Sequence, residues 1–396
     1  MSGFIRFFLL YLLMLFSEIL GHEHLKNHLI RTACLGRIPH AQLFVGPEGS
    51  GTLPLAIAYA QYIICGNSST ENTGGNEACN LKFNQLGHPD LHFVYPTVTN
   101  EEVKSKPKSL DFLKEWRQFV TESPYGGLFD WYKLLDVKNK QGEIRVDDAQ
   151  EIVKALALKS HEGGYKVMVI WMAEKMNIAA ANKLLKLLEE PTDKTVFLLI
   201  SENEEDILQT IRSRCQVVHC NGVPAADITD ALISRENIDA KTAQKIAHQA
   251  QGNYNKALKL IRQEDEDFPF EQWFVQWVRA AFRAKGNATA IHDLIAWSEE
   301  IAGLGRETQK KFLNFCIDMF RQALLLNYQA TDLVYVEPQV ANFQLEKFAP
   351  FVTGNNIEEI FKELAEATYL IERNGNAKIV LTDLSIKLTR LIHKHS

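Results

Sequence analysis

The stretch Ala41-Gln-Leu-Phe-Val-Gly46-Pro-Glu-Gly-Ser-Gly51-Thr-Leu53 decides the fold of this chain. Residues 41–45 are apolar enough to form a buried strand, and residues 53–64 have the apolar spacing of a helix. A strand, a glycine-rich turn and a helix in this order typically bind phosphate, because backbone N–H groups at a helix start point at the anion. A simple turn would not need three glycines at positions 46, 49 and 51. We therefore interpret the stretch as a nucleotide-binding loop.

This loop departs from the working pattern G-x-x-x-x-G-K-[ST] at two positions. Thr52 stands where a lysine should pair with the β- and γ-phosphates, and Leu53 stands where a hydroxyl should hold Mg²⁺. The catalytic carboxylates should follow a later strand, but Trp171 and Met172 occupy those places. Hydrolysis thereby loses its main electrostatic contributions. We predict no catalysis, no cofactor and no metal at the vestigial loop, which consists of Gly46, Gly49, Gly51, Thr52 and Leu53.

The rest of the chain predicts an α/β fold followed by helices. Apolar strands at 166–172 and 195–202 flank a helix at about 177–190 that Pro191 ends, and this alternation predicts a parallel sheet covered on both faces. A helix at about 111–120 belongs to a polar insertion. Three domains are predicted: an α/β nucleotide-binding-like domain at 14–221 with an insertion at about 97–143, a small helical domain at 222–265, and a helical domain at 266–396. An acidic run at 264–267 separates the last two.

Composition narrows the function. Hydrophobic residues make up 46% of the 396 residues and charged residues 23%, which is the balance of a folded protein. The net charge of −6 lacks the basic excess expected of a protein that binds DNA unaided. The six cysteines are scattered through a long chain, which does not resemble a disulfide framework and fits a reducing cytoplasm.

The amino terminus allows two interpretations. Residues 4–16 read FIRFFLLYLLMLF, an apolar run that is short for a membrane span and is interrupted by Arg6. We expect residues 1–13 to be an apolar extension from a mis-assigned start, with the folded protein beginning at Met14. A helical membrane anchor is the alternative.

A second candidate site follows the strand at 195–202. The segment Asp206-Ile-Leu-Gln-Thr-Ile-Arg-Ser213-Arg214-Cys215 places a guanidinium near a domain edge. Such a group can serve a nucleotide in a neighbouring subunit by stabilising charge at the γ-phosphate. Taken alone, the triplet Ser213-Arg214-Cys215 is weak evidence for this role, since most surface arginines only add solubility.

Several motifs resemble the clamp-loader subunits of bacterial DNA polymerase III, an AAA+ family, and its delta prime branch in particular. They are AANKLLKLLEEP at 180–191, TIRSRCQ at 210–216, HPDLHFVYP at 88–96, IRVDDAQEIV at 144–153 and the start at 16–47. The resemblance is close over about residues 14–260. It implies an AAA+ domain, a helical lid and a helical collar in a ring of subunits that sets a sliding clamp on primed DNA.

The resemblance also implies roles for particular residues. Arg214, with Ser213 and Cys215, would point into the ATP site of a neighbouring gamma/tau-type subunit, while this chain itself stays inactive and also meets a delta-type subunit. Asn255 stands where active relatives often place a nucleotide-sensing arginine. Many relatives bind zinc through four cysteines, but this chain keeps only Cys65 and Cys79, so we expect no metal, and His88 is expected to shape a turn.

Two other functions remain open from the sequence. An ATP-hydrolysing AAA+ loader would bind and hydrolyse ATP alone, against which Thr52 and Trp171 speak. A membrane-anchored scaffold would depend on residues 4–16.

Overall fold

The computed structural model describes residues 15–66, 76–137, 140–157, 159–161, 164–262, 269–336 and 338–394. The predicted extension at 1–13 and the acidic run at 264–267 lie outside these ranges. Phe16, the last residue of the apolar amino-terminal run, is buried against the rings of Tyr59 and Tyr62. Within the described ranges, no helix has the length and apolar character needed to cross a bilayer.

Two compact units make up the chain. The first lies within Met1–Val137 and Gln141–Ile261, and the second within Lys138–Lys140 and Arg262–Ser396. Both predicted sites belong to the first unit. The predicted division of that unit into an α/β domain and a lid stays a prediction.

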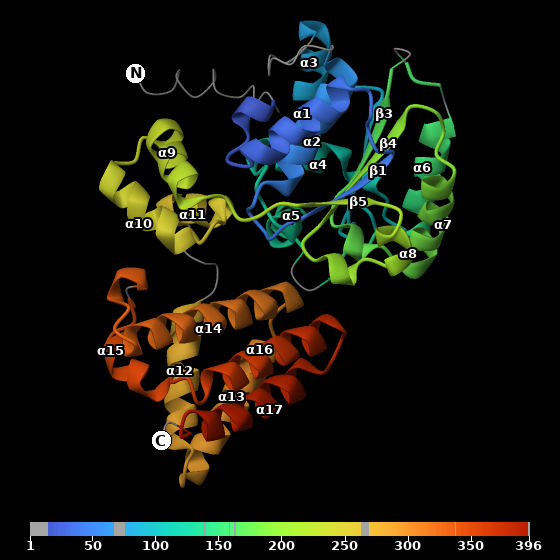
Figure 1. The fold of residues 1–396 in the computed structure, drawn as a ribbon. Coiled ribbons are helices and arrows are strands. Elements are labelled where there is room, and N and C mark those ends of the chain that lie inside the picture. Colours follow the sequence, from blue (N-terminus) through green and yellow to red (C-terminus); the bar gives the residue numbers. More distant parts are fainter. Residues whose placement is uncertain are drawn as a thin grey trace. The chain divides into compact units, whose positions relative to one another are not determined.

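A parallel sheet forms the centre of the first unit (Figure 1). Among the described residues it has the strand order β2-β3-β4-β1-β5, and every neighbouring pair is parallel. The register pairs Val45, the last residue of its strand, with both Ser201 and His219, so the carboxyl ends of three strands lie at one edge. The strands are β1 (Ala41–Val45), β2 (Leu91–Val94), β3 (Lys166–Ile170), β4 (Thr195–Ser201) and β5 (Gln216–His219).

Helices cover both faces of this sheet, as predicted (Figure 1). Successive side chains of a strand point to opposite faces, so Val167 and Val169 join the core under α2 while Met168 and Ile170 join the core under α6 and α7. The helices are α1 (Glu23–Cys34), α2 (Thr52–Cys65), α3 (Glu77–Asn84), α4 (Leu113–Glu122), α5 (Leu128–Leu134), α6 (Val146–Ala157), α7 (Ile178–Glu189) and α8 (Gln209–Arg212), with 3-10 turns η1 (Phe16–Glu18), η2 (Ser109–Phe112), η3 (Ala173–Lys175) and η4 (Glu204–Asp206).

A three-helix group completes the first unit. It consists of α9 (Ala225–Glu236), α10 (Ala240–Ala250) and α11 (Tyr254–Arg262), and its small core includes Ile228, Leu232 and Ala247. Leu20 and Tyr125, from other parts of the unit, join the same core. The group is therefore packed against the rest of the unit.

The described part of the second unit is helical and has its own core. Trp277 is fully buried, stacks on Trp297 with ring centroids 5.0 Å apart, and donates a hydrogen bond from Nε1 to Ser385. The predicted fold class, a parallel α/β domain followed by helices, is confirmed. The elements are α12 (Phe270–Arg283), α13 (Ala288–Ala302), α14 (Arg306–Asn327), α15 (Leu345–Phe348), α16 (Ile357–Glu372) and α17 (Ala377–Leu391), with η5 (Thr331–Leu333) and η6 (Ala349–Phe351).

Candidate functional site

The glycine-rich loop lies between β1 and α2, as its sequence predicts. Gly49 and Gly51 have φ angles of 73° and 89°, in the left-handed region that residues with a Cβ rarely adopt. The N–H of Gly46 donates to the carbonyl oxygen of Ser201 at the end of β4 (3.1 Å), which holds the loop against the sheet edge. The backbone therefore forms a tight, glycine-dependent turn at the carboxyl end of the strands.

The first turn of α2 lacks the groups that hold a triphosphate. Thr52 is its first residue, and the Leu53 side chain is buried in the core. Pro54, also in this turn, has no N–H and removes one of the backbone donors that a helix start offers to an anion. Pro54 was not singled out from the sequence, although a proline at this position is itself a readable signal.

Trp171 places an aromatic ring beside the loop. It follows β3 directly, is 2% exposed, and has its ring centroid 5.3 Å from those of both Trp116 and Phe119 on α4. Trp116 in turn stacks on Tyr95 with centroids 4.1 Å apart. The insertion at about 97–143 thus supplies part of an apolar cluster around Trp171. Met172 is buried beside it in a left-handed conformation with φ 53°.

Tyr125 covers the loop from the other side. A Cβ at Gly51 would lie 2.8 Å from the Tyr125 ring, so only glycine fits beneath it. The hydroxyl of Tyr125 accepts a hydrogen bond from the N–H of Leu20 (2.9 Å), and its ring meets Tyr254 of α11 edge-on. Burial raises the pKa of Tyr125 to about 12, so the side chain stays neutral.

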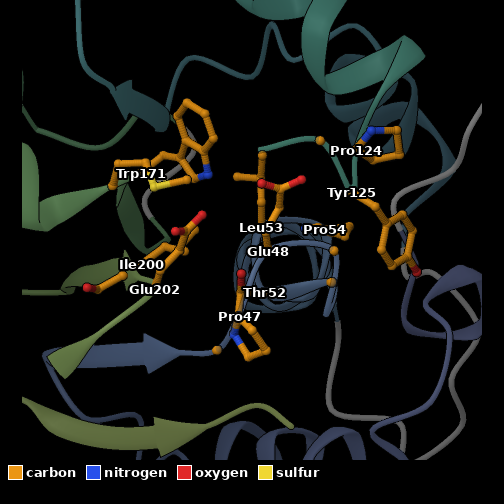
Figure 2. A pocket seen from close by; sticks show the side chains of 16 residues that line it. Pro47, Glu48, Thr52, Leu53, Pro54, Pro124, Tyr125, Trp171, Ile200 and Glu202 are labelled. Carbon is orange, nitrogen blue, oxygen red and sulfur yellow. The ribbon is translucent and has the colours of Figure 1, made fainter. Parts of the chain in front are cut away.

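The cavity at the loop is small and lacks basic side chains. Figure 2 shows Trp171 and Tyr125 on opposite sides, with Leu53 and Glu48 between them. The cavity volume is about 20 Å³, room for one water molecule, whereas small-molecule sites usually measure about 300–1,000 Å³. The lining residues include the acids Glu48 and Glu202 and no Lys, Arg or His. Their charge would repel a phosphate.

A polar cluster fastens α11 to this loop. Asn255 is buried, and its Nδ2 donates to Asp130 on α5 (2.7 Å) and to Glu48 in the loop (3.4 Å). Lys259 pairs with the other oxygen of Asp130 (2.5 Å). The N–H of Tyr254 also donates to the carbonyl oxygen of Gly49 (3.1 Å). We call Glu48, Asp130, Asn255 and Lys259 the polar clamp. Of these four residues, only Asn255 was singled out from the sequence.

Arg214 lies in the short connection between α8 and β5. Its side chain is 35% exposed. Nη1 donates to the carbonyl oxygen of Thr210 (2.8 Å), and Nη2 pairs with Oε1 of Glu189 at the end of α7 (2.5 Å). The two motifs that carry the resemblance, LLEEP and SRC, therefore meet in space. Glu189 was not singled out from the sequence.

The neighbours of Arg214 have local structural roles. The Ser213 hydroxyl donates to the carbonyl oxygen of Thr210 (3.1 Å), which closes the end of α8. Burial raises the pKa of the Cys215 thiol to about 11, so Cys215 stays protonated at neutral pH and is not a reactive thiolate. Arg214 is the charged, accessible member of the triplet.

The expectation that the cysteines are unpaired is wrong for one pair. Cys65 ends α2 and Cys79 lies on α3, and they form a disulfide bond with Cα atoms 5.6 Å apart. The packing of α3 on α2 brings them together, which scattered positions in the sequence did not predict. His88 lies beside them, with one ligand atom from each residue within 4.8 Å of the others. Disulfide sulfurs are not thiolate ligands, so these residues do not fit tetrahedral zinc.

His88 itself has the predicted turn role. Its Nδ1 accepts a hydrogen bond from the N–H of Asp90 (3.1 Å), two residues along the chain. This bond shapes the entry to β2.

Comparisons with known proteins agree on one family. The family model described as DNA polymerase III, delta subunit, matches residues 21–224, more than half of the chain. The chain is 30% identical over 234 residues to DNA polymerase III subunit delta' of Bacillus subtilis, covering 58% of this chain and 56% of that protein. It is 26% identical over 323 residues to the subunit delta' of Pseudomonas aeruginosa, covering 73% and 82%. The match to the Bacillus protein thus spans little more than half of that relative.

Among solved structures, a DNA polymerase III gamma subunit-related protein from Thermotoga maritima resembles the chain with a TM-score of 0.37 at 15% identity. The match covers 92% of this chain and 99% of that one.

Proposed function

Because the chain belongs to the family of DNA polymerase III delta subunits and is a clamp-loader subunit of the delta' type, we propose that it is the non-catalytic member of a cytoplasmic clamp loader. Its proposed partners are gamma/tau-type ATPase subunits and a delta-type subunit, and the assembly would place a sliding clamp on primed DNA. The net charge of −6 fits a protein that meets DNA only within an assembly.

The observation that carries the non-catalytic role is the filled loop. A cavity of about 20 Å³ lined by two acids and no base offers a triphosphate neither volume nor charge. Lysine, Mg²⁺ and a positioned carboxylate are the groups that stabilise phosphoryl transfer. Thr52, Leu53, Trp171 and Met172 supply none of these groups.

Arg214 would contribute to hydrolysis in the neighbouring subunit. A guanidinium carries a fixed positive charge and several donors, which stabilise the negative charge that develops on the γ-phosphoryl oxygens. The α8–β5 connection holds Arg214 at the surface, where an acceptor from another chain can reach it. We expect it to act as an arginine finger, together with the backbone geometry set by Ser213 and Cys215.

The finger is tested by Arg214→Ala in a loader reconstituted with gamma/tau-type and delta-type subunits. An arginine finger is worth about 10³–10⁵ in rate at the site it serves. A loader holds more than one ATP site, so the loss measured for the whole assembly is smaller. We expect its DNA-stimulated ATPase to fall by at least about tenfold. Arg212→Ala is the matched control, because Arg212 is in the same segment and has no ion pair among the described residues. Unchanged hydrolysis in the assembled Arg214→Ala loader would rule out the finger.

The non-catalytic role is tested on the isolated chain. We expect ATP with Mg²⁺ neither to be hydrolysed nor to raise the melting temperature, since a ligand stabilises a protein only to the extent that it binds the folded state. Turnover by the purified chain alone would contradict the proposal.

A further inference from the structure

Two contacts fix the direction of the Arg214 guanidinium. Nη1 donates to the carbonyl oxygen of Thr210, and Nη2 pairs with Glu189. These contacts come from different parts of the chain, 4 and 25 residues away from Arg214. An unrestrained arginine has many rotamers of similar energy, and each contact removes some of them.

The backbone segment that carries Arg214 is also held in place. Ile211, on α8, is fully buried in the same core as Leu184 and Leu188 of α7. The helix that carries Glu189 and the turn that carries Arg214 are thus parts of one packed core. The backbone at Glu189 therefore has a fixed position relative to the turn that carries Arg214.

The two contacts leave donors for a further acceptor. A guanidinium has five N–H groups in a planar fork. One on Nη1 and one on Nη2 are used, so the others stay available to phosphate oxygens. The Glu189 carboxylate, bound at Nη2, therefore orients the guanidinium and leaves its other N–H groups unblocked.

We propose that Glu189 is a positioning residue that holds the Arg214 guanidinium in the orientation in which it serves a nucleotide phosphate of the neighbouring subunit. This inference rests on the proposed function of Arg214. Its effect is on orientation and not on stability, because an ion pair whose side chains are 35% and 49% exposed contributes little to the free energy of folding. A small displacement of a guanidinium that stabilises the transition state, in contrast, lowers the rate of the chemical step.

Glu189→Gln in the reconstituted loader tests the proposal, since it keeps the size of the side chain and removes its charge. We expect kcat for ATP to fall about three- to tenfold while KM stays unchanged, because the lost interaction acts in the transition state. Glu189→Asp, which keeps the charge on a shorter side chain, should recover part of the rate. Glu190→Gln is the matched control: Glu190 is exposed, next in sequence, and forms no ion pair within the described ranges.

A double variant separates positioning from a general structural effect. In an Arg214→Ala background, Glu189→Gln should cause no further loss, since a residue that acts only through Arg214 has nothing left to position. A further loss in that background would overturn the proposal, and so would a normal or raised kcat in Glu189→Gln alone. If Arg214→Ala has no effect, the finger fails; if Arg214→Ala is slow and Glu189→Gln is normal, only the positioning role fails.

The pair is also measurable in the isolated chain, which covers the case of a variant that does not assemble. Arginine side-chain nitrogen resonances would identify Arg214 by their loss in Arg214→Ala. We expect the same resonances to shift in Glu189→Gln and not in Glu190→Gln. Resonances that do not move in Glu189→Gln would overturn the proposal without any activity measurement.

Discussion

Trp171 makes two contributions at one position. Its ring lines the cavity at the loop, and the same ring packs against Trp116 and Phe119 in the apolar cluster. A buried aromatic ring of this kind is costly to remove, because protein interiors are closely packed. Trp171 is therefore expected to contribute to stability.

We predict that Trp171→Ala lowers the free energy of unfolding of the first unit by about 3–5 kcal/mol, the usual cost of truncating a buried aromatic side chain. Chemical denaturation, monitored by circular dichroism, measures this loss of stability. The variant should gain no ATPase. A loss below about 1 kcal/mol would show that the ring is not part of a packed core.

His22 makes the same unit sensitive to acid. It donates from Nε2 to the carbonyl oxygen of Ser50 in the loop (2.7 Å), and burial holds its pKa below the usual value of 6.5. The folded state therefore favours the neutral ring, whereas the unfolded chain takes up a proton near its usual pKa. Stability is fully present above that pKa and is lost as the pH falls through it towards the folded pKa.

The measurement compares the denaturation midpoint at about pH 7.5 and about pH 5.5, on either side of the ordinary histidine pKa. We expect His22→Gln to reduce the loss seen on acidification. The exposed His24, two residues away, supplies the control variant His24→Gln. Equal acid sensitivity in all three proteins would show that His22 does not contribute.

At the scale of elements, the polar clamp joins α11 to α5 and to the loop. Asp130 accepts from Asn255 and pairs with Lys259. The N–H of Tyr254 adds a backbone hydrogen bond to Gly49. These contacts are made within the protein itself, so they hold α11 against the loop.

Removing the clamp should loosen α11 selectively. We predict that Asn255→Ala costs about 1–3 kcal/mol, because the half-buried carboxylates of Asp130 and Glu48 lose a donor. Amide hydrogen exchange in α11 and in the loop should become faster, while exchange in β3 and β4 stays slow. Asn221→Ala, at an exposed asparagine, is the control. Unchanged exchange in α11 would contradict the role of the clamp.

The sequence predicted the parts of the fold whose signals are local. The strand, glycine loop and helix at 41–64 and the strands at 166–172 and 195–202 are readable because each pattern lies within one continuous stretch of at most about two dozen residues. The clamp was not predictable in this way: Glu48, Asp130 and Asn255 are far apart in the chain and each is an ordinary polar residue alone. The disulfide was missed for the same reason, since the packing of α3 on α2 decides it.

The same distinction between local patterns and long-range packing applies to the candidate sites. Thr52, Leu53, Trp171 and Met172 were recognisable as departures from a known pattern of residues. The small volume of the cavity at the loop also depends on Tyr125 and Pro124, from an insertion whose packing no local pattern reveals.

At the scale of the whole molecule, the two units have separate cores. Trp171 belongs to the core of the first, and Trp277 to the core of the second. Each unit should therefore lose stability independently when its own core is damaged.

We predict that Trp277→Ala lowers the stability of the second unit by about 3–5 kcal/mol and leaves the loop and the Arg214 segment intact. Calorimetry should show one transition shifted and the other unchanged, and Trp171→Ala should give the opposite pattern. A single transition that shifts equally in both variants would mean that the units unfold as one.

The small cavity also bears on what substitutions at the loop could achieve. A lysine introduced at position 52 would bring a charge to a cavity of about 20 Å³ that Trp171 and Tyr125 also line. A carboxylate introduced at position 171 would remove the ring that packs against Trp116 and Phe119. Either substitution should therefore weaken the protein without by itself making room for a ligand.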